Sequence, residues 1–442
     1  MRIVHLTAGA GTRYCGACLR DSALVRALRE AGHDVLLQPL YLPIHDEGAG
    51  EEGSTQPIRM GGIETWLAVH TPLLGRLAAA MGGALSSRAA LRVASALGDM
   101  TDPSALGPMT EATLRVESGA LRALLERVAR EVEAYSPDVV ILSNALLLGL
   151  APVLRETTNA TVVCTLQSEV SFIEDLQEPW PERVWEALKS LTWSAHGFVA
   201  VSRAHGAEMA ARLDLPLEDI FVVPHGVQAD TFTPLEAPNR HRRVAYVARI
   251  DERHGAHRLL KAFGDLPLGD VPPTLHVAGS LTAQDRPYLA RLKSLVQELE
   301  IEDRVTFSPN CTPAEKRALL GESGVLCVPT SREAAGRYVL EAWSSGCAVL
   351  APRVGSLVEW LEESGGGVLY DPDLEGGLST ALRALCEDEL EVAALAKKGE
   401  SAVQERYSDG HMAQGMLQAL RSIMQPEHRT ATDRPRAEEA HA

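Results

Sequence analysis

Short runs rich in valine, isoleucine and leucine recur along the chain and alternate with segments of helical character. Such runs are apolar on both faces, as in parallel strands that helices cover on both sides. The first series of predicted strands comprises residues 3–6, 35–37, 139–142, 161–165, 198–201 and 221–223, with helix-like segments at 22–31, 121–134 and 182–190. The second series comprises 244–247, 275–278, 305–307, 325–328, 349–351 and 368–370. This alternation predicts an α/β fold with parallel sheets.

A stretch rich in proline and charge separates the two series. It spans residues 232–243, FTPLEAPNRHRR, and has no apolar period, which is typical of a domain linker. The chain has 442 residues, about three times the usual length of one domain. We therefore predict two tandem domains, 1–232 and 233–406, each a Rossmann-like doubly wound parallel sheet.

Charge and cysteine usage narrow the class of protein. The chain has 42 basic and 59 acidic residues and a net charge of -17, a field that repels nucleic acid. Its seven cysteines are odd in number and scattered, which fits a reducing compartment rather than a disulfide framework. The N-terminus, MRIVHLT, lacks the features of a signal peptide, and no run of eighteen apolar residues occurs. We expect a cytoplasmic protein without a transmembrane segment.

Two segments stand apart from the alternation. Residues 73–98 are alanine-rich and amphipathic, which predicts surface helices inserted in the first domain. The alternative is a flap that binds an acceptor or makes peripheral contact with a membrane. The tail 426–442 is polar and lacks large apolar residues, so we expect it to be disordered.

The densest group of candidate functional residues follows the predicted strand 325–328. The segment PTSREAAGRYVLEAWSSG, residues 329–346, opens a helix at the carboxyl end of a parallel strand, where open α/β sheets bind ligands. Glu333 and Glu341 are eight residues apart, so on a helix they would lie two turns apart on one face. Gly336 permits close approach to the backbone, and the first helical N–H groups favour phosphate. By themselves, two such glutamates are also typical of a solvated helix face.

An arginine follows the first strand of the second series. Arg249 ends this strand and is followed by IDERHG. Its rigid, permanently charged guanidinium suits a diphosphate, although an arginine at a strand end is also a common salt-bridge partner. Two such loops at one sheet edge favour a pyrophosphate site.

Together these segments resemble retaining glycosyltransferases of family 4, which have the GT-B fold of two Rossmann-like domains facing across a cleft. The resemblance extends to about residue 424 and rests on VVPHGVQADTF (222–232), ARIDERHG (248–255), PTSREAAGRYVLEA (329–342) and REAGHDV (29–35). It is closest to members whose N-terminal loop reads CGxCxRD, here CGACLRD at 15–21. In GT-B chains a final helix, here about 407–424, packs back on the first domain.

The resemblance implies a donor site in the second domain. Glu333 would contact the transferred hexose, Glu341 the ribose, and Arg249 with His254 the leaving diphosphate, with no metal and no cofactor beyond the nucleoside-diphosphate sugar itself. The other residues expected at the donor are Gly336, Ala335, Arg337, Gly16 and Gly226. The residues expected at the acceptor or the cleft are Gln167, Glu169, Arg20 and Asp21. The donor base and sugar and the acceptor stay open.

The chain departs from the family pattern at several positions. His254 stands at the family's lysine, Ala335 at its phenylalanine, and Gln167 where many members have a histidine. The RVGS run at Gly355 lacks the usual paired glycines. These departures support an alternative function, in which the protein binds a sugar nucleotide or a partner protein without turnover.

The loop at Cys15 and Cys18 admits three interpretations. A redox dithiol is one and half of a zinc site is another, but no second CxxC or HxxxH motif supplies the remaining ligands. We favour a glycine turn at Gly16 close to the donor phosphate or the acceptor. GAGTRY at 9–14 fits only part of a dinucleotide fingerprint, and no P-loop motif occurs.

Overall fold

The computed structural model describes residues 1–9, 16–41, 103–116 and 119–425. The segment 73–98, the tail 426–442 and Cys15 lie outside these residues. Among the described residues, no helix is both long enough and apolar enough to cross a membrane.

The chain folds into two compact units. Unit 1 consists of the described residues up to Val223 and from Ala413 onward, and unit 2 consists of Pro224–Met412. The division therefore falls before Pro224 rather than within the predicted linker 232–243. The physical reason is burial, because Val227 and Phe232 belong to the hydrophobic core of unit 2.

Unit 1 contains a parallel sheet with the strand order β2-β1-β3-β4-β5-β6 among the described residues. Its strands are β1 (Arg2–Thr7), β2 (Asp34–Pro39), β3 (Val139–Leu142), β4 (Thr161–Leu166), β5 (Gly197–Ala200) and β6 (Ile220–Val222). The helices are α1 (Gly16–Glu30), α5 (Pro103–Leu114), α6 (Gly119–Ala134), α7 (Ala151–Thr157), α8 (Glu169–Glu174), α9 (Trp180–Leu191), α10 (Arg203–Leu213) and α18 (Asp409–Ile423). The last of these packs on the sheet, since a Cβ added to Gly197 would lie 2.7 Å from Ile423.

Unit 2 contains a second parallel sheet, with the order β12-β11-β10-β7-β8-β9. Its strands are β7 (Arg243–Val247), β8 (Thr274–Gly279), β9 (Val305–Pro309), β10 (Val325–Cys327), β11 (Ala348–Pro352) and β12 (Gly367–Tyr370). The helices are α11 (Ala256–Gly264), α12 (Arg286–Glu298), α13 (Pro313–Glu322), α14 (Arg337–Ser344), α15 (Ser356–Ser364), α16 (Gly377–Glu387) and α17 (Glu389–Arg406). The strand order reverses between β7 and β10, as in the doubly wound dinucleotide-binding fold.

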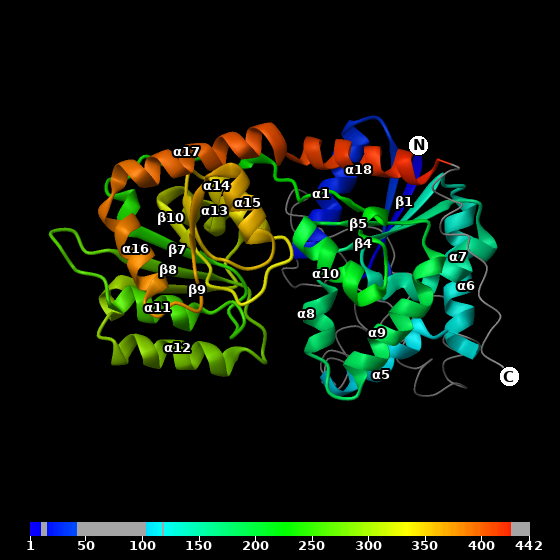
Figure 1. The fold of residues 1–442 in the computed structure, drawn as a ribbon, viewed down its shortest axis with the longest axis horizontal. Helices are drawn as coiled ribbons and strands as arrows, with labels where there is room; N and C mark the ends of the chain where they lie inside the picture. Colours follow the sequence, from blue (N-terminus) through cyan, green and yellow to red (C-terminus); the bar gives the residue numbers. More distant parts are fainter. Residues whose placement is uncertain (10–15, 42–102, 117–118, 426–442) are drawn as a thin grey trace. The chain divides into compact units, whose positions relative to one another are not determined.

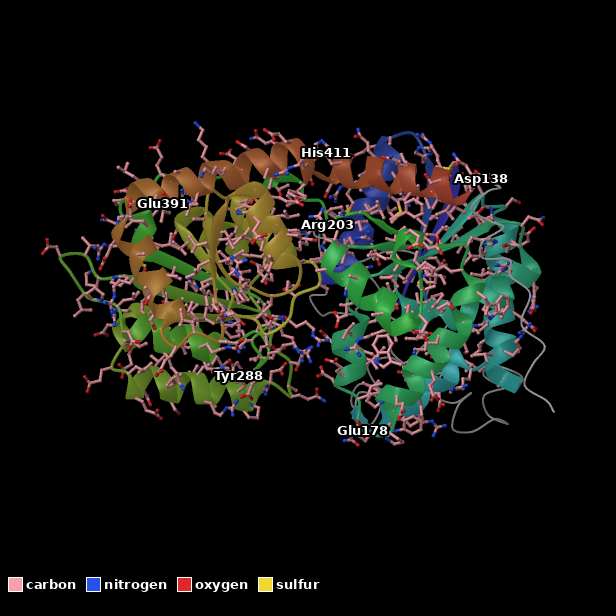
Figure 2. The ribbon with its side chains drawn as sticks, viewed as in Figure 1. Asp138, Glu178, Arg203, Tyr288, Glu391 and His411 are labelled. Carbon is pink, nitrogen blue, oxygen red and sulfur yellow. The ribbon has the colours of Figure 1, made fainter. Side chains whose placement is uncertain are left out.

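Helices cover both faces of the unit 2 sheet. Figure 1 shows α11 and α12 below the strands and α14, α15 and α17 above them. Tyr288, labelled in Figure 2, ties α12 to α11, because its hydroxyl lies 2.8 Å from His257 Nδ1 in the first turn of α11. On the opposite face, Trp360 stacks on Tyr407 with ring centroids 5.5 Å apart.

The prediction of two α/β domains is confirmed. Each of the twelve predicted apolar runs overlaps one of the strands β1–β12, and three of them extend one residue beyond the end of the strand. Five of the inner strands, β3, β4, β5, β10 and β11, are buried at every position. This burial explains why the runs are continuously apolar rather than alternating.

Candidate functional site

Two loops of unit 2 meet at the carboxyl edge of its sheet. They follow β7 and β10, the neighbouring strands at which the strand order reverses. Ser331 N donates to Arg253 O at 3.1 Å. Gly255, with φ +73°, approaches so closely that an added Cβ would lie 2.3 Å from Pro329 O. The loops that carry Arg249, His254 and Glu333 thus pack together at the position where doubly wound sheets bind ligands.

Glu333 lies in the loop before α14, not on the helix. The expectation that Glu333 and Glu341 lie two turns apart on one helix is therefore wrong, because α14 begins only at Arg337, after the left-handed Gly336. The Glu333 carboxylate binds the backbone immediately before the first residue of α14. Its Oε1 accepts hydrogen bonds from Ala335 N at 3.2 Å and Gly336 N at 2.9 Å. Both N–H groups are thereby engaged by Glu333.

The rest of the Glu333 residue is fixed as well. Tyr338 donates its hydroxyl to Glu333 Oε2 at 2.8 Å. Burial and the Glu333 charge raise the pKa of Tyr338 well above its ordinary value, so the phenol stays a donor. Glu333 O accepts from Ser356 N at 3.1 Å, and Gly355 packs against the same carbonyl. The sequence did not indicate Tyr338, because a spacing of five residues matches neither the helix nor the strand period.

Glu341 is a buried carboxylate between two cations. Lys316 Nζ of α13 donates to Glu341 Oε1 at 2.9 Å, and Arg337 Nε donates to the same oxygen at 3.3 Å. Burial alone would raise the pKa of Glu341, but the charges and hydrogen bonds of Lys316 and Arg337 hold that pKa below its ordinary value. Lys316 was not predicted, because a lysine in a helix ordinarily faces solvent.

Arg337 also joins Gly226 to this group. Its Nη1 donates to Gly226 O at 3.2 Å, so the loop before residue 232 contacts a residue that was predicted to lie at the donor. Gly226 has no room for a side chain, since a Cβ there would lie 2.7 Å from Ser408 O. Gly226, Arg337 and Glu341 therefore form one connected set within unit 2.

The two predicted diphosphate ligands are held by acidic residues. Arg249 Nη2 lies 2.9 Å from Asp285 Oδ2, and its Nε lies 3.3 Å from Asp251 Oδ2. His254 Nδ1 lies 2.6 Å from Asp251 Oδ1. Burial raises the pKa of Asp251, but the hydrogen bonds and charge of His254 and the charge of Arg249 outweigh it and lower that pKa. The Arg249 side chain is still 45% exposed, so it remains accessible to a ligand.

In unit 1, the four predicted acceptor residues form a buried polar network. Gln167 Nε2 donates to Asp21 Oδ1 at 3.2 Å and to Ser143 O at 2.5 Å. Arg20 Nη1 lies 3.9 Å from Asp21 Oδ1, and both side chains are completely buried. Burial lowers the pKa of Arg20, an effect that the Asp21 charge opposes.

Glu169 connects this network to α10. Its two carboxylate oxygens accept from Ala145 N and Gln167 N, each at 2.9 Å, and His205 Nε2 lies 3.2 Å from Oε2. His5 also belongs to this group, since its Nε2 lies 3.2 Å from Asp21 Oδ1. Its signal in the sequence is a histidine inside the apolar run IVHL. Gly16 is the first residue of α1, and Cys18 is buried in the same helix.

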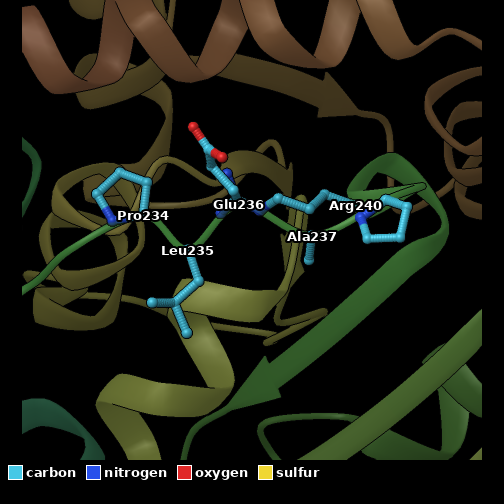
Figure 3. A pocket seen from close by; sticks show the side chains of 6 residues that line it. Pro234, Leu235, Glu236, Ala237 and Arg240 are labelled. Atoms are coloured by element: carbon cyan, nitrogen blue, oxygen red, sulfur yellow. The ribbon is translucent and has the colours of Figure 1, made fainter.

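A surface hollow of about 470 Å³ lies elsewhere on unit 2 and contains none of the predicted site residues. It is lined by residues 234–238 and Arg240 of the proline-rich stretch, whose side chains Figure 3 shows along one segment of the chain. Arg240 anchors this segment by donating to Ser323 O at 2.7 Å and Ser345 O at 2.9 Å.

Family models match both units. The model described as Glycosyltransferase Family 4 matches residues 102–231, and the model described as Glycosyl transferases group 1 matches residues 227–402. The second match contains both meeting loops and both glutamates. The chain belongs to the family 4 glycosyltransferases.

Similar proteins agree with this assignment. D-inositol 3-phosphate glycosyltransferase of Pseudarthrobacter chlorophenolicus is 25% identical over 300 residues, 64% of this chain and 71% of that protein. The corresponding enzyme of Corynebacterium urealyticum is 26% identical, over 56% of this chain and 61% of that protein. The chain thus spans between about three fifths and seven tenths of these two relatives.

Solved structures share the fold. Sucrose-phosphate synthase from Thermosynechococcus elongatus superposes with a TM-score of 0.70 at 20% identity, over 96% of this chain and 99% of that one. HepE of Anabaena in complex with UDP-glucose gives a TM-score of 0.66 at 16% identity, over 96% and 100%. These matches support the GT-B fold of this glycosyltransferase.

Proposed function

We propose that this glycosyltransferase moves a hexose from a nucleoside diphosphate sugar to an acceptor, with retention of configuration. Unit 2 binds the donor and unit 1 binds the acceptor. The observation that carries the proposal is the meeting of the Arg249 and Glu333 loops at the strand reversal of unit 2. The structure of HepE with UDP-glucose supports a sugar nucleotide as the donor class.

Each donor-site residue has a chemical role in this proposal. Departure of the sugar leaves negative charge on the diphosphate, and a fixed guanidinium such as Arg249 lowers the barrier by stabilising that charge. Glu333 contacts the hexose with a carboxylate held by two N–H groups and Tyr338. Glu341 binds the ribose. These roles need no metal. Gln167, Glu169, Arg20 and Asp21 are buried, so in this proposal they support the acceptor site of unit 1 from beneath its surface.

Nucleotide binding to the wild type and to Glu341→Ala tests the donor site. A ligand at about 100 times its dissociation constant adds about 2.7 kcal/mol of stability, which is visible as a shift in melting temperature. We expect UDP, GDP, ADP or one of their sugars to raise the melting temperature of the wild type, and to raise it less in the variant. Absence of a shift with every nucleotide would contradict the proposal.

A second candidate function is binding without turnover. It is favoured by the ion pairs of Arg249 with Asp251 and Asp285, because these carboxylates offset the positive charge that would bind a diphosphate. The variant His254→Lys separates the two functions, because it places a permanent charge at the position where the family has lysine. A gain in turnover supports the transferase. A gain in nucleotide affinity, with no transfer of hexose to an acceptor and no hydrolysis of the donor, supports binding alone.

A further inference from the structure

Lys316 is a buried lysine at the donor site. It has 3% of its surface exposed, although lysine is almost never buried unless it is paired. It lies on α13, 25 residues before Glu341, and its Nζ reaches Glu341 Oε1 at 2.9 Å. A capping box of Thr312 and Glu315 fixes the start of α13 and thereby the position of Lys316 in the first turn of that helix.

The two cations around Glu341 act on one oxygen. Lys316 and Arg337 both donate to Oε1, and within the described residues no hydrogen bond to Oε2 is formed. An ionised carboxylate only accepts hydrogen bonds, so Oε2 is suited to a ligand that donates. Neighbouring hydroxyl groups are such donors, and a ribose carries two of them side by side.

Fixing the carboxylate has a consequence for selectivity. A carboxylate that is free to rotate adapts to one hydroxyl or to two, whereas a carboxylate clamped at Oε1 keeps one orientation. A site built around a hydroxyl rejects the analogue without it, because its buried polar groups then lose their partners. One hydrogen bond to a charged group corresponds to roughly a tenfold to hundredfold difference in affinity.

We propose that Lys316 is a positioning residue that holds Glu341 for recognition of the ribose diol, and that the donor is consequently a ribonucleoside diphosphate sugar rather than a 2′-deoxyribonucleoside one. This inference rests on the proposed function, in which Glu341 binds the ribose. It narrows the donor class and excludes a deoxythymidine diphosphate sugar as the preferred donor.

Titration calorimetry with matched nucleotide pairs tests the inference. The probes are UDP with dUDP, GDP with dGDP and ADP with dADP, and the readout is the ratio of dissociation constants within the pair that binds. We expect the wild type to bind the ribonucleotide at least about tenfold more tightly. Lys316→Met is expected to bring this ratio close to one, and Lys316→Arg to restore part of it. Lys261→Met, at an exposed lysine of α11, is the matched control and keeps the wild-type ratio.

The outcomes separate this inference from the proposed function. A wild-type ratio near one, or a Lys316→Met protein that keeps the wild-type ratio, overturns the role of Lys316. Failure of the wild type to bind any of the six nucleotides overturns the proposed function, and the inference falls with it. If Lys316→Met does not fold, Lys316→Gln is measured in its place, with the same expected loss of the ratio.

Discussion

Gly355 offers a direct test of how the Glu333 loop is held. This glycine precedes α15 and has φ 49° and ψ −135°, a backbone conformation open essentially to glycine alone. A Cβ at this position would lie 2.0 Å from Glu333 O and 3.1 Å from Glu333 C. The neighbouring Ser356 N donates to the same carbonyl. Replacing Gly355 with alanine therefore strains its own backbone and pushes against the Glu333 loop.

The expected cost of Gly355→Ala has two parts. A side chain in such a sparsely populated conformation costs about 1–3 kcal/mol. The overlap is with a backbone carbonyl, so rotation of a side chain does not relieve it, and overpacking of this kind costs about 1–3 kcal/mol more. We expect unit 2 to lose about 2–6 kcal/mol of unfolding free energy. We also expect the affinity for the sugar nucleotide to fall at least about tenfold as Glu333, which contacts the hexose in the proposed function, moves; this corresponds to about 1.4 kcal/mol in binding.

Gly376→Ala is the matched control. Gly376 lies in unit 2 with φ 71°, and a Cβ there would meet nothing within 4 Å. Its replacement costs only the left-handed backbone conformation, about 1–2 kcal/mol. Hydrogen exchange of unit 2 peptides gives the loss of stability, and calorimetry gives the affinity for the sugar nucleotide. If both variants lose equal stability and bind the sugar nucleotide equally well, the close approach of Gly355 does not hold the Glu333 loop.

Three further predictions concern packing and charge. Gly399→Ala should destabilise unit 2 by about 1–3 kcal/mol, because a Cβ there would lie 2.2 Å from the Trp343 ring. The control Gly415→Ala would place its Cβ at an ordinary 3.5 Å from Val223 and should not destabilise the protein. Equal denaturation midpoints of the two variants would contradict this prediction. Asp251 has a pKa lowered from 3.8, so its contribution to stability is complete above about pH 3.8 and is lost as the pH falls through the lower folded value. Asp251→Asn should flatten the acid end of the stability profile of unit 2 measured in urea from pH 5 to 2.5, and an unchanged slope would refute this. Glu169→Gln should lower the stability of unit 1 by about 1.5–3 kcal/mol, because the amide nitrogen of the new side chain then faces a backbone N–H donor. The control Glu182→Gln, at an exposed position, should have no effect on the melting temperature. Equal melting temperatures of the two variants would argue against the buried network.

The sequence alone determined the layered α/β architecture and the edge of the sheet that carries the Arg249 and Glu333 loops. Continuous apolar runs such as those of β4 and β11 indicate burial on both faces of the sheet. The polarity of each residue is sufficient to predict this burial, because it does not depend on which particular residues lie opposite. The carboxyl ends of parallel strands share one edge, so the sequence predicts that the Arg249 and Glu333 loops lie at the same edge of the second sheet. The boundary of unit 2 was misplaced, because sequence polarity does not show which core receives Val227 and Phe232.

Only the tertiary structure decided which groups face each carboxylate. Lys316 and Glu341 are 25 residues apart, and Gln167 and Asp21 are 146 apart, so no periodicity within one element reports either contact. The left-handed Gly336 likewise delays the start of α14, so that Glu333 lies in the loop and Glu341 in the helix. The two glutamates therefore do not form the predicted pair on one helix. Hydrogen bonds are short and directional, so their partners depend on how elements cross in space, whereas apolar burial depends mainly on which face of its own element a residue occupies.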